Sequence, residues 1–138
     1  IQSLKSIILE HPETTFHLYF PPSSILWWDN EYRRGTMEIK LEAIRLLITE
    51  LAPLSNVDRY LFQTDETLVK NLNLYMDSVH FNQQVNLELV NRMKNKQGLI
   101  PKENLDETLN DLLSSMRKMI SEYSTNGILE DYPTAVTP

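Results

Sequence analysis

Apolar residues recur along this chain with two different periods, and the change of period predicts alternating helices and strands. Residues 1–10 carry isoleucine and leucine at helical spacing, and residues 14–20 form a short aromatic run that stops at two prolines. Residues 31–52 show a long helical stripe, and residues 57–62 form a second short apolar run. This alternation is typical of parallel strands joined by right-handed helical crossovers.

Two segments between these elements lack a clear period. Residues 23–30 follow the prolines and are expected to form a turn or loop. Trp27 and Trp28 within it are expected to pack in the core. The alternative is that they form a platform on which a carbohydrate stacks. Residues 65–75 fit either a short helix or an irregular loop.

The last part of the chain predicts two more helices, over residues 81–94 and 104–123. We divide the chain into an α/β unit over residues 1–97 and an amphipathic helix over residues 98–124 that packs on the same domain. Residues 125–138 contain two prolines and are expected to form a flexible tail.

Two strands are too few for a sheet that is covered on both faces. Such sheets are normally wider, so further strands must come from elsewhere. The sequence also opens at Ile1, inside an apolar-periodic stretch. We therefore expect the chain to be the later half of a larger α/β domain. The alternative is a complete chain that pairs its strands across a homo-oligomer.

Composition narrows the classes of function. The formal net charge is −6, from 19 acidic and 13 basic residues, which argues against a nucleic-acid partner. The small basic clusters at 33–34 and 92–96 are interpreted as solvated helix ends. The chain has no cysteine, which excludes thiol nucleophiles and cysteine-based zinc sites. It has only 3 glycines and no apolar run near the ~20 residues that span a bilayer, so we expect neither a cofactor nor a membrane span.

Asp77 and His80 are the most suggestive pair of side chains. They lie between the second predicted strand and the next helix, at the carboxyl end of the sheet, where open α/β folds place their sites. A carboxylate three residues before a histidine can accept the imidazole Nδ1–H, which leaves the other ring nitrogen as a base. In the alternative, Asp77 caps the following helix and His80 is a half-buried residue at its entry.

The other candidate side chains give weaker signals: His11, His17, Ser23, Ser24, Asp65 and Glu66. Both histidines are expected to be structural, and no histidine pair has metal-ligand spacing, so no metal site is expected. The two serines follow a strand but lack the Gly-x-Ser-x-Gly elbow of a nucleophile. The adjacent acids are more typical of a solvated helix start than of a catalytic pair.

Two stretches of the sequence are similar to a known family. Residues 15–28 read TFHLYFPPSSILWW, which resembles a strand-then-proline signature of bacterial cell-surface SGNH-type proteins, relatives of GDSL esterases. The stretch from Val57 through Asn71-Leu72 to Asp77-Ser78-Val79-His80 and Asn86 is similar to the same proteins. The resemblance covers roughly residues 1–123.

The resemblance implies a three-layer, parallel-sheet architecture of the flavodoxin-like SGNH kind, of which this chain supplies only the later strands and helices. It makes His80 the general base and Asp77 its orienting acid. Phe81-Asn82 departs from the family's usual pattern at this point, so the resemblance does not define the detailed shape of the pocket. More importantly, nothing in residues 1–138 matches the family's Gly-Asp-Ser block or its oxyanion donors.

These implications define two hypotheses. In the first, the chain is the C-terminal portion of a serine esterase or acyltransferase for acylated cell-envelope glycans or small esters, inactive without the upstream nucleophile. In the second, it is a non-catalytic surface or scaffolding module, with the apolar stripe of the last helix as a partner face. The family places either one in the bacterial periplasm or on the cell surface.

Overall fold

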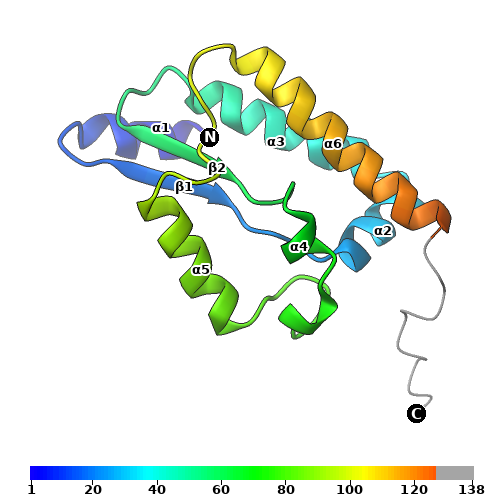
Figure 1. Cartoon of the computed structure of the whole chain (residues 1–138). Coiled ribbons are helices and arrows are strands. Elements are labelled where there is room, and N and C mark those ends of the chain that lie inside the picture. The colour runs from blue at the N-terminus through cyan, green and yellow to red at the C-terminus, as the bar shows by residue number, and fades with distance from the viewer. Residues whose placement is uncertain (127–138) are drawn as a thin grey trace.

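The computed structural model describes residues 1–126, so the tail expected from residue 125 lies almost wholly outside the described residues. Figure 1 shows helices packed around a small central sheet. In chain order the elements are α1 (Gln2–Glu10), β1 (Phe16–Phe20), α2 (Ile25–Arg33), α3 (Met37–Leu51), β2 (Val57–Leu61), α4 (Glu66–Val69), the 3-10 helix η1 (Leu72–Leu74), α5 (Gln83–Lys94) and α6 (Leu105–Asn126).

The two strands pair in parallel, which confirms the α/β class and the parallel arrangement predicted from the alternation. The register runs from Phe16 opposite Val57 to Phe20 opposite Leu61. Within residues 1–126 the sheet contains these two strands, and its β2 side is extended by a single antiparallel bridge between Tyr60 and Leu99. The carboxyl ends of both strands therefore lie at the same end of the sheet, where the segments after Phe20 and Leu61 begin.

Helices cover both sides of this two-stranded sheet (Figure 1), so the expectation that two strands are too few for a sheet covered on both faces is wrong for the described residues. Successive side chains of β2 point to opposite faces of the sheet. Leu61 packs in a cluster with residues of α2, α3 and α6, whereas Tyr60 packs with Val85 and Leu89 of α5. A third cluster joins Ile8 of α1 to the start of the strands. Among the described residues, no helix is long and apolar enough to cross a membrane.

The apolar stripe of α6 is part of the core. Its fully buried residues are Leu109, Leu113, Met116 and Ile120. They pack against α2 and α3, whose buried residues belong to the same cluster. This removes the observation that favoured a partner-binding face on the last helix. The boundary near residue 97 between the two predicted parts stays a prediction.

The loop predicted over residues 23–30 is wrong, because α2 begins at Ile25. Ser24 is the N-cap, with an extended backbone and a hydroxyl that accepts the Trp27 N–H at 3.4 Å. Ile25 and Trp28 are buried, and their spacing of three residues points both into the core. The two prolines therefore end the strand without preventing a helix that begins three residues after Pro22.

The single helix predicted over residues 31–52 is divided in two. Gly35 has a φ of +70°, a left-handed conformation that glycine adopts at no steric cost. Its N–H donates to the Tyr32 carbonyl at 3.0 Å, which closes the end of α2 before α3 begins at Met37. The apolar stripe begins only at Met37, after this break, so the predicted start at residue 31 came from the polar residues before it.

Candidate active site

Asp77 and His80 lie in a closed loop that follows η1. Its base is an antiparallel bridge between Tyr75 and Phe81. The Met76 N–H donates to the His80 carbonyl at 2.8 Å, and the Asn82 N–H donates to the Leu74 carbonyl at 2.8 Å. The segment between these bonds is thus a short, hydrogen-bonded loop with Asp77 and His80 near its tip.

The Asp77 carboxylate holds the loop together with both of its oxygens. Oδ1 accepts the N–H groups of Val79 and His80, each at 2.7 Å. Oδ2 lies 2.6 Å from Nδ1 of His80. The carboxylate therefore fixes Nδ1 as the protonated nitrogen, and the lone pair lies on Nε2. No residue among those described bonds to Nε2, so this nitrogen is available as a base.

The same contacts set the charge of Asp77. Backbone hydrogen bonding from His80, followed by its side-chain bond and the Val79 N–H, lowers the Asp77 pKa to about 2. Asp77 is therefore anionic across the neutral and mildly acidic range. His80 and Asp77 are exposed, at 70% and 55% of their side-chain surface. The alternative of a half-buried helix-entry histidine is wrong.

Asp77 does not cap the following helix either. The N-cap of α5 is Asn82, whose Oδ1 accepts the N–H groups of Gln84 and Val85 at 3.0 and 3.2 Å. The capping alternative is therefore wrong, and the hydrogen-bonding capacity of Asp77 goes to the loop and to His80.

The loop is pinned to the segment that follows β1. The Ser78 carbonyl accepts both the N–H of Ser24 at 3.1 Å and its hydroxyl at 2.6 Å. The Tyr75 hydroxyl donates to the Pro22 carbonyl at 3.2 Å, and burial raises the Tyr75 pKa to about 12, so the phenol stays protonated. These bonds place the Asp77–His80 loop over the carboxyl end of β1.

Gln63, just after β2, also bonds to the segment that follows β1 at this end of the sheet. Its Oε1 accepts the Ser23 N–H at 3.1 Å and the Trp28 Nε1–H at 2.8 Å. Its Nε2 donates to the Pro21 carbonyl and lies 3.4 Å from the Ser23 hydroxyl oxygen. The sequence analysis assigned no role to Gln63, which comes directly after the second predicted strand.

The serines that follow β1 are structural, as predicted. Ser24 is fully buried, caps α2 and donates its hydroxyl to the Ser78 carbonyl. Ser23 is bound to Gln63 through both its N–H and its hydroxyl. Neither hydroxyl is bonded to an imidazole, so neither is arranged as an activated nucleophile.

The other two histidines also have structural contacts, as expected. His11 ends α1 through its main-chain N–H, which donates to the Ile8 carbonyl at 3.3 Å, and its exposed imidazole lies 3.5 Å from the Glu13 carboxylate. His17 places Nδ1 at 3.4 Å from both the Tyr60 hydroxyl and the Asp58 carboxylate. Over residues 1–126, no three or more His, Asp or Glu side chains gather so as to hold a metal ion.

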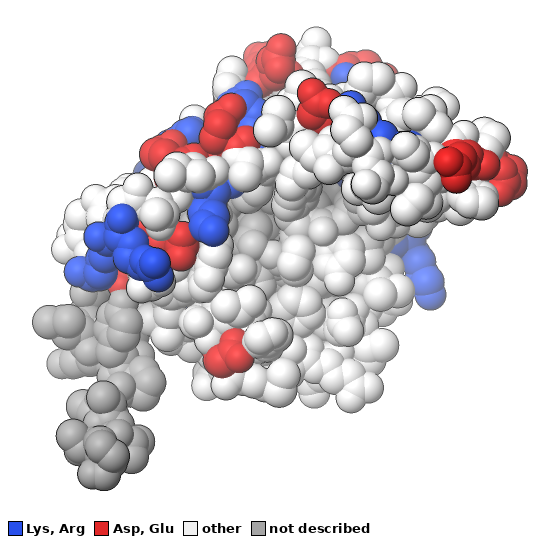
Figure 2. All heavy atoms as spheres, turned by 180° about the vertical axis from the view of Figure 1, so that it is seen from behind, with Lys and Arg blue, Asp and Glu red and all other residues white. Residues whose placement is uncertain are grey.

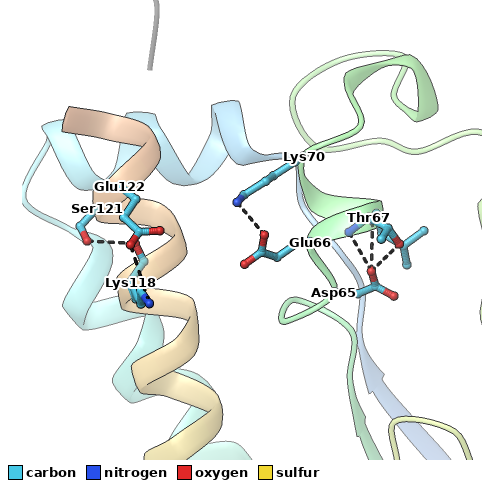
Figure 3. Close-up of polar contacts among 8 residues, drawn as sticks. Asp65, Glu66, Thr67, Lys70, Lys118, Ser121 and Glu122 are labelled. Atoms are coloured by element: carbon cyan, nitrogen blue, oxygen red, sulfur yellow. Dashed lines mark hydrogen bonds and ion pairs between the residues drawn. The ribbon is translucent and has the colours of Figure 1, made fainter. Parts of the chain in front are cut away.

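The adjacent acids after β2 separate toward different partners (Figure 3). Asp65 is the N-cap of α4 and accepts the N–H of Thr67 at 2.9 Å, while its other oxygen pairs with Arg92. Glu66 pairs with Lys70 at 2.7 Å along the helix. These acids mark a helix start, as predicted, and do not form a catalytic pair.

A pH titration tests the role assigned to Asp77. The folded-state pKa of about 2 lies below the ordinary value of 3.8, so the loop contacts are stabilising above about pH 4 and are lost as pH falls toward 2. We expect the amide resonances of Val79 and His80 to shift with a midpoint near 2 by NMR. Asp77→Asn, which keeps the acceptor oxygen, should abolish that transition. A midpoint at or above 3.8 would contradict the assignment.

No protein-family model, curated protein or solved structure matches this chain. The class of protein is therefore a mixed α/β unit with a parallel two-stranded sheet over its described residues and an aspartate–histidine pair beside its carboxyl end. Any more particular assignment rests on the chemistry of that pair and on the sequence resemblance.

Proposed function

We propose that this chain is the C-terminal portion of an SGNH-type serine esterase or acyltransferase, in which His80 is the general base and Asp77 orients it. The observation that carries the proposal is the 2.6 Å contact between Asp77 and Nδ1 of His80, in a loop bonded to the segment after a parallel strand. That contact leaves Nε2 to accept a proton from a serine hydroxyl.

The serine and the oxyanion donors come from a part of the polypeptide outside residues 1–138. Within the described residues the serines nearest in sequence to the sheet's carboxyl end, Ser23 and Ser24, are committed to structural bonds. The exposed position of His80 fits a base that works on a group supplied by another segment. In this proposal the three-layer SGNH sheet is completed by that segment.

The proposed reaction transfers an acyl group. The serine oxygen attacks the ester carbonyl while His80 takes its proton, and the alcohol then leaves with that proton. Water or a sugar hydroxyl next attacks the acyl-enzyme while His80 takes its proton, and the acyl–serine bond breaks as His80 returns that proton to the serine oxygen, which gives hydrolysis or transfer. The proposed substrate is an acylated glycan of the bacterial envelope, and the proposed location is the periplasm or cell surface.

The experiment is covalent labelling of the gene product expressed from its natural start by a fluorophosphonate, which reacts with base-activated serines. We expect the gene product to be labelled and residues 1–138 alone to stay unlabelled. A gene product that is folded and unlabelled would favour the non-catalytic binding module instead.

A further inference from the structure

One edge of the sheet is unpaired within the described residues. The Phe16 N–H donates to the Asn56 carbonyl at 2.9 Å, and the Phe20 carbonyl accepts the Phe62 N–H at 3.3 Å, so these residues direct their main-chain groups toward β2. Main-chain groups alternate along a strand, and those of His17 and Tyr19 therefore face the opposite edge. An edge of this kind is a template for another strand.

A groove of about 310 Å³ runs beside this edge, between β1, α1 and α3. It is lined mainly by aliphatic and aromatic side chains, including Leu4, Leu18, Phe20, Leu47, Ile48 and the stem of Arg59. The same helix also exposes Ile39 and Leu46, seven residues apart, at 67% and 51% of their surface.

The distribution of charge fits a covered surface. α3 lies behind α6 in Figure 1, so its outer side belongs to the face that Figure 2 shows. On that face most charged side chains gather along the upper border and at the two ends, and one acidic group stands near the lower centre among residues of other kinds. Few charged side chains would therefore lose their hydration if another segment covered the centre of this face.

The charge and free hydrogen-bond donors of Arg59 indicate which kind of side chain would bind in the groove. Its side chain is 1% exposed, and its Nη1 donates to the Ile48 carbonyl at 3.3 Å. Nε and Nη2 have no hydrogen-bond partner among residues 1–126. Burial lowers the Arg59 pKa, an effect that the nearby Asp58 only partly offsets. A buried guanidinium with two free donors on one side matches a carboxylate, which accepts two parallel bonds.

We propose that the groove binds an extended segment that adds a strand to β1 and directs an Asp or Glu at Arg59. The segment belongs to the part of the gene product that carries the nucleophile, so this inference rests on the proposed function. A second copy of β1 fits less well, because Phe16–Phe20 contains no acidic residue to pair with Arg59.

The first test compares Arg59→Met in two proteins. In residues 1–138 alone, the substitution removes a buried, incompletely bonded charge and should raise the thermal midpoint by roughly 2–5 °C. In the gene product from its natural start, where an acid pairs with Arg59, it should lower the midpoint by a similar or larger shift. The matched control is Arg34→Met, an exposed arginine that should change neither midpoint. A rise in both proteins would overturn the proposal.

Hydrogen exchange provides a second test that needs no substitution. The amides of His17 and Tyr19 should exchange rapidly in residues 1–138 and at least about 100-fold more slowly in the gene product, while the Leu18 amide, directed toward β2, should be protected in both. Equal, fast exchange at His17 and Tyr19 in both proteins would overturn the docking. Protection without a labelled serine would overturn the proposed function and leave the docking standing.

Discussion

Replacing His80 with alanine in the gene product from its natural start should lower kcat/KM for ester hydrolysis by roughly 10⁴- to 10⁶-fold. The reason is the geometry of the loop. Asp77 holds Nδ1 at 2.6 Å and leaves Nε2 free, so in the proposed enzyme the serine loses its base when the imidazole is removed. Because 70% of the His80 side chain is exposed, the fold should tolerate the change.

Two matched variants separate catalysis from folding. Asp77→Asn keeps an acceptor for the Val79 and His80 N–H groups but loses control of the imidazole tautomer, and it should cost roughly 10⁴-fold. His11→Ala removes an exposed histidine at the end of α1 and should leave kcat/KM unchanged. A loss of less than tenfold in a folded His80→Ala protein would exclude His80 as the base.

Trp28→Ala should destabilise the fold by about 3–5 kcal/mol. The indole is 1% exposed in the cluster of α2, α3 and α6, and its ring lies edge-on to Trp27 at a centroid distance of 4.8 Å. Its Nε1–H also donates to Gln63 at 2.8 Å. The substitution therefore leaves a cavity in this cluster. It also removes one of the donors to Oε1 of Gln63 at the carboxyl end of the sheet.

Urea unfolding followed by circular dichroism measures this loss. The matched control is Trp27→Ala, which removes the same side chain from a half-buried position beneath Lys40 and should cost clearly less. Equal losses for the two variants, or a loss below about 1 kcal/mol for Trp28→Ala, would show that the buried indole and its bond to Gln63 do not hold α2 in place.

The elements with a clear period could be predicted from the sequence. Residues 1–10 and 81–94 gave helices close to their observed bounds, and the two short apolar runs gave β1 and β2. The bond between Asp77 and His80 could also be anticipated, because a three-residue separation in a tight turn brings the side chains together. Local spacing was sufficient in each of these cases.

The remaining features depend on contacts between distant residues. Ser24 bonds to Ser78, 54 residues away, and Gln63 bonds to Ser23, 40 residues away, and neither contact leaves a local pattern. The helix α2 was missed because its aromatic residues and preceding prolines resemble a loop, whereas capping by Ser24 and burial of Trp28 favour a helix. Tertiary packing decided these segments.

The central claim is that His80 activates a serine supplied from outside residues 1–138. Its most direct test is a peptide mass map of the fluorophosphonate-treated gene product. The account predicts one labelled serine, located outside these 138 residues, and loss of the label in His80→Ala. A label on Ser23 or Ser24, or a label that persists without His80, would contradict it.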